Sequence, residues 1–325
     1  MYAIEVITPG KEYGLQPVEC EVPRPGPGEV LVKAAAAGVN RADLLQALGQ
    51  YPPPPGAPST LGLEVSGQIA AVGEGVTEWH IGMQVCALLA GGGYAEYAVA
   101  AQECLLAVPP GVDIVAAAGL PEAFFTAWTN LVDAARLRPA DVVLIHGGSS
   151  GVGSAAIQLC AARGHVVFAT AGSPEKCAAC LALGAKRAIN YRDEDFVDVV
   201  RDETAGRGID VILDMVGGDY INRNFQAAAP WGRIVNVAYQ AGPVATVNFA
   251  LMLRKRLTLT ATTLRSRSNA EKGAIRDALL KEVWPLLAAG RIKPVIDRIF
   301  PLAEAQAAHA WMKSGAHVGK ILLAA

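Results

Sequence analysis

Hydrophobic and polar residues alternate in two different ways along the chain. Before residue 120, short stretches such as Glu29–Lys33 alternate polar and apolar side chains, as half-buried β-strands do. Runs of proline and glycine at 23–28 and 52–56 separate these stretches, and both residues favour turns. The pattern predicts a β-rich, barrel-like domain that is interrupted by one short helix over 41–48.

After residue 120 the strands become continuously apolar and alternate with helical stretches. Asp141–His146 is the clearest such strand, and its composition is typical of a strand buried on both faces of a parallel sheet. The alternation predicts an α/β fold with a doubly wound parallel sheet of the Rossmann type. The predicted strands are 141–146, 166–170, 188–190, 211–213, 233–237 and 257–264, and the clearest helices are 121–136 and 175–183.

The last segment changes pattern again. It predicts a helix over 271–289, a strand over 295–300, a helix over 302–314 and a strand over 320–323. We therefore expect a nucleotide-binding domain over 121–265, inserted between the two parts, 1–120 and 266–325, of one catalytic domain.

Composition and charge exclude several classes of protein. Of the 325 residues, 52% are hydrophobic and 18% are charged, and the net charge is -2. Such a chain can bury a large core, and it lacks the basic excess that nucleic acid or an anionic membrane would favour. The longest stretch without a charged side chain, 142–162, is rich in glycine and serine, so it is a poor membrane helix.

Two further features indicate a cytoplasmic protein. The chain opens on a strand-like segment rather than a signal peptide, because no basic and then apolar leader is present. The six cysteines are irregularly spaced in a long chain, which favours reduced thiols over a disulfide framework.

A glycine-rich loop carries the strongest chemical signal. Gly148-Ser149-Ser150-Gly151-Val152-Gly153 follows an apolar strand and opens a helix. In that context, glycines let backbone N–H groups approach a pyrophosphate at the positive end of the helix. Serine replaces the central glycine of the usual G-x-G-x-x-G pattern. The strand, loop, helix and next strand together predict dinucleotide binding.

The end of the next strand favours NADPH over NADH. The segment 170–176 carries no acid at the strand tip, where NAD-binding proteins place a carboxylate for the ribose 2′-hydroxyl. Ser173 and Lys176 are suited to receive a 2′-phosphate, and we expect Glu175 to point away. The alternative for Lys176 is a solvated helix residue.

The chain resembles the zinc-free quinone oxidoreductase branch of the medium-chain dehydrogenase/reductase superfamily, and within it the tumour-suppressor-inducible NADPH quinone oxidoreductase subfamily. The resemblance covers nearly the whole chain. It implies a GroES-like catalytic domain, a Rossmann domain and a homodimer that pairs strand 257–264. The segments that carry it are 40–43, 49–56, 61–67, 89–93, 150–153, 189–191, 264–267 and 318–320.

The residues at the expected zinc positions argue against a metal. Related alcohol dehydrogenases carry a Cys ligand where Asn40 stands and a His where Leu63 stands, and their four-cysteine lobe has no counterpart here. Zinc needs at least three protein ligands. The lone pair Cys177 and Cys180 indicates packed thiols, with a metal or redox pair as the alternative. His146 is expected to be packed beneath the glycine-rich loop.

Three residues are candidates for catalysis. The resemblance implies that the Tyr51 phenol hydrogen-bonds a quinone oxygen, although a surface tyrosine that orders the proline loop is the alternative. Asn40 is expected to face the nicotinamide and orient the cofactor or a carbonyl oxygen. Asp43 either assists it or only caps the helix that follows.

A larger set is expected to bind the cofactor. It comprises the glycine-rich loop, the residues proposed for the 2′-phosphate, and residues at strand ends or in segments of resemblance. Tyr191 is expected near the adenine ribose, with a core-edge tyrosine as the alternative. The full set is Thr126, Gly148, Ser149, Ser150, Gly151, Val152, Gly153, Gly172, Ser173, Lys176, Tyr191, Gly217, Ala238, Tyr239, Gln240, Thr263, Leu264, Arg265 and Lys320.

These features predict an NADPH-dependent quinone oxidoreductase that transfers hydride from nicotinamide C4 without a metal. One alternative is an enoyl or alkenal reductase of the same superfamily. Another is an NADPH-binding RNA-binding or structural protein similar to zeta-crystallin, which the near-neutral charge disfavours. A zinc alcohol dehydrogenase would require metal ligands that the sequence lacks.

Overall fold

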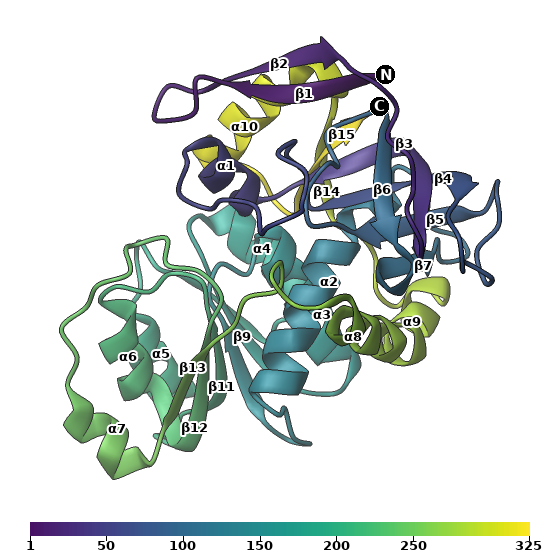
Figure 1. Cartoon of the computed structure of the whole chain (residues 1–325). Coiled ribbons are helices and arrows are strands. Elements are labelled where there is room, and N and C mark those ends of the chain that lie inside the picture. Colours follow the sequence, from purple (N-terminus) through teal and green to yellow (C-terminus); the bar gives the residue numbers. More distant parts are fainter. The chain divides into compact units, whose positions relative to one another are not determined.

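The computed structural model describes all residues, 1–325, and the chain folds into two compact units (Figure 1). The first unit comprises Met1–Phe125 and Leu264–Ala325, and the second comprises Thr126–Thr263. The chain therefore leaves the first unit once and returns to it once. The sequence analysis placed the boundaries at 120/121 and 265/266. Its division into a nucleotide-binding domain and a catalytic domain stays a prediction.

The second unit is built on a six-stranded, fully parallel sheet in the order β10-β9-β8-β11-β12-β13. The strand order reverses between β8 and β11, so the loops that follow these two strands border the switch point at which such sheets bind ligands. The strands are β8 (Val142–Ile145), β9 (Val166–Ala171), β10 (Arg187–Asn190), β11 (Ile209–Asp214), β12 (Ala228–Asn236) and β13 (Thr258–Ala261).

Helices cover this sheet because each offers one apolar face. Phe196 of α5 and Phe225 of α6 are fully buried in one cluster with Leu144, Phe168 and Ile212 of the sheet, and Figure 1 shows α5 and α6 side by side. The unit contains α3 (Gly151–Ala162), α4 (Pro174–Ala182), α5 (Phe196–Glu203), α6 (Tyr220–Ala227) and α7 (Phe249–Lys255).

The first unit is built on a seven-stranded sheet in the order β14-β15-β3-β4-β5-β7, with β6 also paired to β3. Gly67 lets β4 approach the backbone of β3 closely, because a Cβ there would lie 2.0 Å from the Lys33 carbonyl oxygen. The strands are β3 (Glu29–Val39), β4 (Glu64–Val72), β5 (Gln84–Leu88), β6 (Tyr97–Ala101), β7 (Leu105–Ala107), β14 (Ile296–Pro301) and β15 (Lys320–Ala324).

A separate two-stranded sheet pairs the start of the chain with itself in this unit. It consists of β1 (Tyr2–Ile7) and β2 (Gly14–Glu19). Tyr13 and Leu15 pack with Leu44, Tyr94 and Ile321 in one buried cluster. The helices of the unit are α1 (Arg41–Ala47), α8 (Asn269–Glu282), α9 (Trp284–Ala288) and α10 (Ala305–Ser314), and α2 (Pro121–Trp128) begins in this unit and ends in the other.

The fold class is confirmed, since a parallel Rossmann-type sheet and a GroES-like β-rich unit are both present. Three element boundaries were wrong. The helix expected over 271–289 is two helices, because Pro285 opens α9 and has no N–H to continue α8. The helix expected over 121–136 changes to wider π-type turns at Thr129–Ala134, and β13 ends at Ala261 rather than at 264.

All six cysteines are free thiols. None of the six cysteines forms a disulfide; Cys20 is exposed, Cys177 is half-buried and the others are buried. Burial raises the pKa of the Cys104 thiol to about 11.

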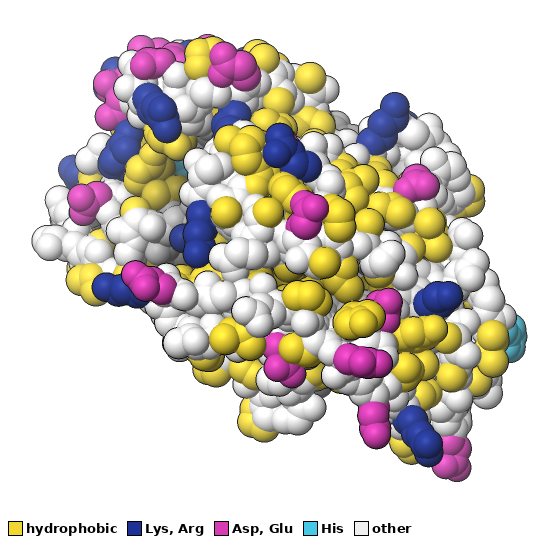
Figure 2. Space-filling model, turned by 90° about the horizontal axis from the view of Figure 1, so that it is seen from above, with side chains coloured by type: hydrophobic (Ala, Val, Ile, Leu, Met, Phe, Trp, Pro, Cys, Tyr) yellow, Lys and Arg dark blue, Asp and Glu magenta, His cyan; other side chains and the backbone are white.

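On the face drawn in Figure 2, basic and acidic side chains are interspersed rather than gathered by sign. None of the helices has the length and hydropathy required to cross a membrane.

Candidate cofactor and substrate sites

The glycine-rich loop of the second unit is closely packed. Gly147 has a φ of +64°, and a Cβ there would lie 2.6 Å from the Met215 sulfur. A Cβ at Gly153 would lie 2.2 Å from the Gly147 carbonyl oxygen. Larger residues at these positions would displace the loop backbone, so the turn requires glycine at both.

Ser150 begins α3 as its N-cap, and its hydroxyl accepts a hydrogen bond from Gly153 N at 3.0 Å. The first turn of a helix has four N–H groups without helical partners. With one of them satisfied by Ser150, the N–H groups of Gly151 and Val152 remain at the positive end of the helix dipole. The loop and helix start therefore fit the pyrophosphate of a dinucleotide.

A buried relay of side chains supports this loop. Gly147 N donates to the Thr170 hydroxyl at 3.3 Å, and that hydroxyl lies 3.1 Å from His146 Nδ1. On its other side His146 Nε2 lies 2.7 Å from Asn224 Oδ1. An amide oxygen can only accept, so Nε2 carries the proton and Nδ1 accepts from Thr170. Burial lowers the pKa of His146, which keeps the ring neutral.

The relay ends at Asp214, which is fully buried at the end of β11. One carboxylate oxygen accepts from the side chains of Asn224 and Asn236 at 2.9 and 3.0 Å. The other accepts from Val216 N at 2.6 Å and Gly217 N at 3.2 Å. The relay and Asp214 thereby join the loops after β8 and β11 by consecutive hydrogen bonds.

The loops after β11 and β12 are paired. Ala241 N donates to Val216 O at 2.8 Å, and a Cβ at Gly217 would lie 2.6 Å from the Tyr239 ring. Gln240 and Tyr239 are exposed, and Ala238 is half-buried. The structure thus brings Gly217 and Tyr239 into contact, as expected for residues of one site.

The proposed 2′-phosphate residues gather at the end of β9. The Tyr191 hydroxyl lies against Gly172, where a Cβ would approach it to 2.4 Å, and Ser173 caps α4 by accepting from Lys176 N at 3.3 Å. Glu175 lies in the first turn of α4, and the expectation that it points away stays a prediction. A hydrogen bond to its own backbone and one from the Ser173 hydroxyl lower the pKa of its exposed carboxyl.

Asn40 of the first unit is held by a buried ion pair. Glu64 is fully buried and forms a salt bridge with Lys320. The Asn40 amide donates to Glu64 Oε1 at 2.9 Å and to Gly38 O at 3.3 Å, and its oxygen accepts from Lys320 Nζ at 2.6 Å. Both amide hydrogens are therefore used internally. Lys320 also donates to Val39 O at 3.1 Å, so its ammonium has three partners in this unit.

Asp43 anchors a second buried chain of polar groups. Its carboxylate accepts from Asn40 N at 2.7 Å, from Gly62 N at 3.1 Å and from the Tyr94 hydroxyl at 3.1 Å. Tyr94 lies 3.1 Å from His309 Nε2, whose other nitrogen lies 2.9 Å from the Tyr13 hydroxyl. Burial raises the pKa of Asp43 to about 6 and lowers that of His309 to about 3.

Tyr51 is half-buried beside Arg265. The guanidinium carbon lies 5.4 Å from the Tyr51 ring centroid, within the range of cation–π attraction. Burial and the charge of Glu122 raise the pKa of Tyr51 against the opposing charge of Arg265. The phenol therefore keeps its proton at neutral pH.

The structure groups the predicted residues by unit. In the first unit, Tyr51 and Arg265 form one cluster. Asn40 and Lys320 belong to the hydrogen-bonded network of Glu64, and Asp43 joins this network through the Asn40 backbone N–H. The glycine-rich loop and the residues at the ends of β9 and β11 form the sites of the second unit. Thr126 lies in α2, while Thr263 and Leu264 follow β13.

Sequence reasoning missed several supporting residues. Their shared feature is a buried polar side chain at a strand end or helix face. A polar residue that closes an apolar strand, as Asp214 does, is the one signal that could have identified them. They are Glu64, Tyr94, Thr170, Asp214, Asn224, Asn236 and His309.

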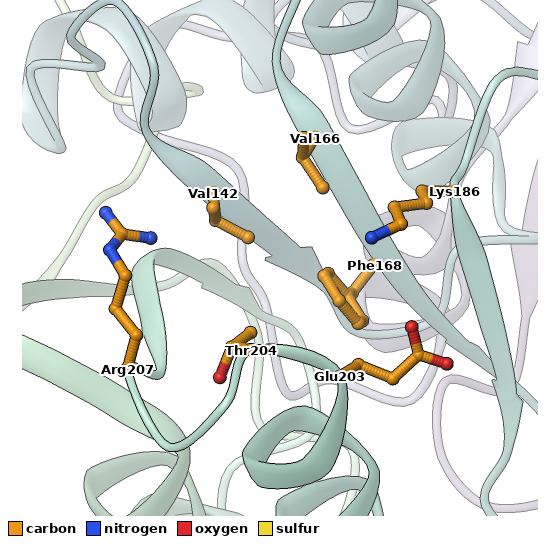
Figure 3. Close-up of a pocket in the computed structure, with 7 residues that line it drawn as sticks. All are labelled: Val142, Val166, Phe168, Lys186, Glu203, Thr204 and Arg207. Carbon is orange, nitrogen blue, oxygen red and sulfur yellow. The ribbon is translucent and has the colours of Figure 1, made fainter.

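A shallow pocket lies elsewhere in the second unit (Figure 3). Val142, Val166 and Phe168 form its apolar part, and Lys186, Glu203 and Arg207 contribute charged side chains. Val142 and Val166 are the first residues of β8 and β9. The pocket therefore opens at the amino ends of the strands, away from the glycine-rich loop at their carboxyl ends.

Comparison with known proteins places the chain in a family. Residues 26–110 match the alcohol dehydrogenase GroES-like domain, and residues 183–323 match a zinc-binding dehydrogenase domain. Quinone oxidoreductase of Sus scrofa is 33% identical over 297 residues, which cover 89% of this chain and 86% of that protein. The chain therefore belongs to the medium-chain dehydrogenase/reductase superfamily.

Its relatives include two kinds of reductase. The structure of Escherichia coli quinone oxidoreductase complexed with NADPH matches with a TM-score of 0.89 and 30% identity, covering 100% of both chains. CurK enoyl reductase matches with a TM-score of 0.85 and 30% identity, covering 99% of this chain and 98% of that one. Phthioceranic/hydroxyphthioceranic acid synthase of Mycobacterium tuberculosis is 33% identical over 98% of this chain, which spans only 15% of that protein's length.

The residues around Asn40 do not fit the zinc that the name of one matched domain implies. The chain has no group of three or more His, Cys, Asp or Glu side chains placed to hold a metal ion. Instead, the Lys320 ammonium contacts both potential oxygen ligands, Asn40 Oδ1 and the Glu64 carboxylate. The Lys320 ammonium already balances the charge of Glu64, so these residues do not fit a zinc ion.

Proposed function

We propose that the protein is an NADPH-dependent oxidoreductase that reduces quinones. The observation that carries the proposal is the tightly packed turn at 147–153, which starts α3 and is tied through the His146 relay to the loop after β11. This arrangement supports a dinucleotide pyrophosphate at the switch point of the sheet. The relative with bound NADPH supports the choice of cofactor.

The residues at the end of β9 support a phosphorylated ribose. Gly172 leaves space for the Tyr191 hydroxyl, and the N-terminus of α4 carries the Ser173 hydroxyl and the Lys176 side chain. We propose that the Ser173 hydroxyl, which accepts from Lys176 N, and the Lys176 ammonium bind the 2′-phosphate.

The first unit supplies the groups for the substrate. The cofactor provides hydride from its nicotinamide when bound. Tyr51 keeps its proton and offers an O–H donor, whereas Asn40 and Asp43 hold the backbone that precedes α1. We propose that Tyr51 contacts substrate and that Asn40 and Asp43 act as positioning residues, because their polar atoms are engaged within the unit.

A second candidate function is reduction of a conjugated enoyl or alkenal substrate. Two solved relatives are enoyl reductases, JamJ and CurK, at 27% and 30% identity. The chemistry differs in the carbon that accepts hydride, not in the cofactor. An RNA-binding role gains no support, since the net charge is -2 and the charges of Figure 2 are mixed in sign.

We also propose a homodimer that pairs the edge strand β13. This strand lies at the end of the parallel sheet, and Leu259 and the nearby side chains of Phe249 and Leu253 are exposed. Exposed apolar groups beside an open edge favour association with another strand. Sedimentation equilibrium of the wild type and a Leu253→Glu, Leu259→Lys variant would test this.

The decisive experiment combines cofactor titration with a substrate panel. NADPH is expected to bind more tightly than NADH, and Ser173→Ala with Lys176→Ala is expected to remove most of that difference. A 1,4-quinone, an alkenal and an enoyl thioester are then compared under NADPH. Turnover of the thioester alone would favour the second candidate, and equal affinity for both dinucleotides would contradict the proposed phosphate site.

A further inference from the structure

Arg265 is a buried cation whose hydrogen bonds are incomplete. Only 6% of the residue is exposed. Its Nε donates to Ala90 O at 2.8 Å, and its Nη1 lies 3.5 Å from Tyr51 O, at the limit of a hydrogen bond. The buried Nη2 has no hydrogen-bond partner. A guanidinium has five N–H donors, and those on Nη2 lack an acceptor.

An unpaired buried donor is costly, so its presence calls for an explanation. Leaving a buried polar group unsatisfied costs about 1–3 kcal/mol, and more for a charged group. Buried arginines are normally paired with carboxylates, yet no salt bridge with Arg265 is formed. Burial lowers the pKa of Arg265, but the group remains a cation at neutral pH because its ordinary pKa is so high.

The surroundings of Nη2 are fixed and small. Gly91 stands next to it, since a Cβ there would lie 3.5 Å from Nη2 and only 2.7 Å from the Pro58 carbonyl oxygen. The Tyr51 ring lies against the guanidinium. Lys272 donates to Arg265 O at 3.0 Å, which fixes the backbone of the segment. Three loops thus hold one unsatisfied cationic donor beside a phenol that keeps its proton.

We propose that Arg265 binds the oxygen atom of the substrate on which negative charge develops, with Tyr51 packed beside it. The inference rests on the proposed function and deepens it. The conjugated carbonyl substrate gains two electrons and one hydrogen as hydride from NADPH, and one carbonyl oxygen becomes an oxyanion. Water then protonates that oxygen. Arg265 stabilises the anion through a charge-assisted hydrogen bond and transfers no proton.

The negative charge of Glu122 opposes the binding of an anion at Arg265. Its charge acts on both Arg265 and Tyr51, so it weakens the attraction of an anion. The backbone N–H of Glu122, which donates to Glu64 Oε2 at 2.8 Å, is independent of its side chain. Glu122→Gln should therefore strengthen anion binding without removing that bond, whereas Arg265→Met should weaken it.

The experiment uses 4-nitrophenol as an unreactive probe and needs no cofactor. Its absorption spectrum distinguishes phenol from phenolate, so binding by a cation appears as ionisation at lower pH. We expect the wild type to bind 4-nitrophenolate at least about tenfold more tightly than Arg265→Met, since one charge-assisted hydrogen bond is lost. Arg265→Lys should retain part of the affinity, and Glu122→Gln should exceed the wild type.

A matched control removes a neighbouring charge. Arg267→Met loses one cation two residues away and should bind the probe as the wild type does. With NADPH and quinone, Arg265→Met should lower kcat about 100-fold, the effect of losing one oxyanion donor. If Arg265→Met does not fold, Glu122→Gln and Arg265→Lys still test the prediction in opposite directions.

The outcomes separate this inference from the proposed function. Equal affinity of wild type, Arg265→Met and Glu122→Gln for 4-nitrophenolate would overturn it, even if quinone turnover is observed. A higher Kd for NADPH with unchanged probe binding would make Arg265 a cofactor residue and also overturn it. Probe binding that depends on Arg265, without any quinone turnover, would support the oxyanion site and contradict the proposed function alone.

Discussion

Glu64 in the first unit and Asp214 in the second are both buried carboxylates, and they are stabilised in different ways. The first unit buries opposite charges directly, in the pair of Glu64 and Lys320. The second unit buries one carboxylate, Asp214, and surrounds it with two amide side chains and two backbone N–H groups. The first arrangement fixes side chains near the proposed substrate groups. The second fixes loop backbone, which a pyrophosphate would contact.

The difference indicates what each unit must keep rigid. An ion pair tolerates small changes in direction because Coulomb attraction acts in all directions. A carboxylate that accepts four N–H bonds is sensitive to geometry, because each bond has a preferred angle. We therefore expect Glu64 to depend on the charge of its partner, and Asp214 on the precise placement of its four donors.

The largest effect is expected from Lys320→Met. The substitution leaves Glu64 as a buried charge without its cation, and breaking a buried pair in this way typically costs about 3–5 kcal/mol. Denaturant titration would measure the free energy of unfolding. Arg207→Met, which breaks the more exposed pair with Asp210, is the control and should cost about 0–1 kcal/mol. Similar losses in both variants would contradict the comparison.

The next effect is expected from Asp214→Asn. The amide keeps the shape but turns one acceptor into a donor that faces donors from Asn224 and Asn236 or from the loop N–H groups. We expect a loss of about 2–3 kcal/mol in unfolding free energy and a higher Kd for NADPH, followed by fluorescence titration. Unchanged NADPH affinity in a destabilised variant would show that the network supports the fold but not the phosphate loop.

A third prediction concerns pH and the chain from Asp43 to Tyr13. The pKa of His309 falls from its ordinary 6.5 to about 3 on folding. The unfolded state therefore binds more protons between these values, and stability is lost as pH falls. The pKa of Asp43 rises from 3.8 to about 6, so this group gains stability as pH falls through the same region.

Between about pH 4 and 6 the two contributions oppose each other, each with a slope of about 1.4 kcal/mol per pH unit. Replacing His309 by Gln removes only the contribution of His309, which lowers stability as pH falls. The free energy of unfolding of His309→Gln, minus that of the wild type, should therefore rise as the pH is lowered from about 6.5. A difference that stays constant with pH would show that His309 is not held neutral.

The smallest effect is expected from Ser150→Ala, which removes the N-cap of α3. The loss should be about 1 kcal/mol, with Ser173→Ala at the cap of α4 as the matched control in the same unit. Only Ser150→Ala should weaken binding of NADH as well as NADPH. Equal effects on both dinucleotides by the two variants would contradict the division between pyrophosphate and 2′-phosphate residues.

The sequence predicted the fold class well because local periodicity carried it. The apolar strands after residue 120 and the alternating strands before it have different patterns, and each matches its sheet. The break at Pro285 was readable from the sequence, because proline has no N–H to continue the helix before it. The end of β13 at Ala261 depends on pairing with β12, which no local pattern records.

The contacts within the candidate sites could be predicted from local sequence only where neighbours in sequence form them. The loop 148–153 and the cap at Ser173 are local structures. The chain of Asp43, Tyr94 and His309 joins residues far apart in sequence, so only tertiary packing brings it together.

The distribution of the thiols has a practical consequence for spectroscopy. Cys20 in the first unit is exposed and Cys177 in the second is half-buried, while Cys86, Cys104, Cys160 and Cys180 are buried. A maleimide dye should therefore react first at Cys20 and more slowly at Cys177. Sequential labelling with a donor and an acceptor would place one fluorophore on each unit of the unmodified chain, so that energy transfer reports any movement between them when a dinucleotide is added.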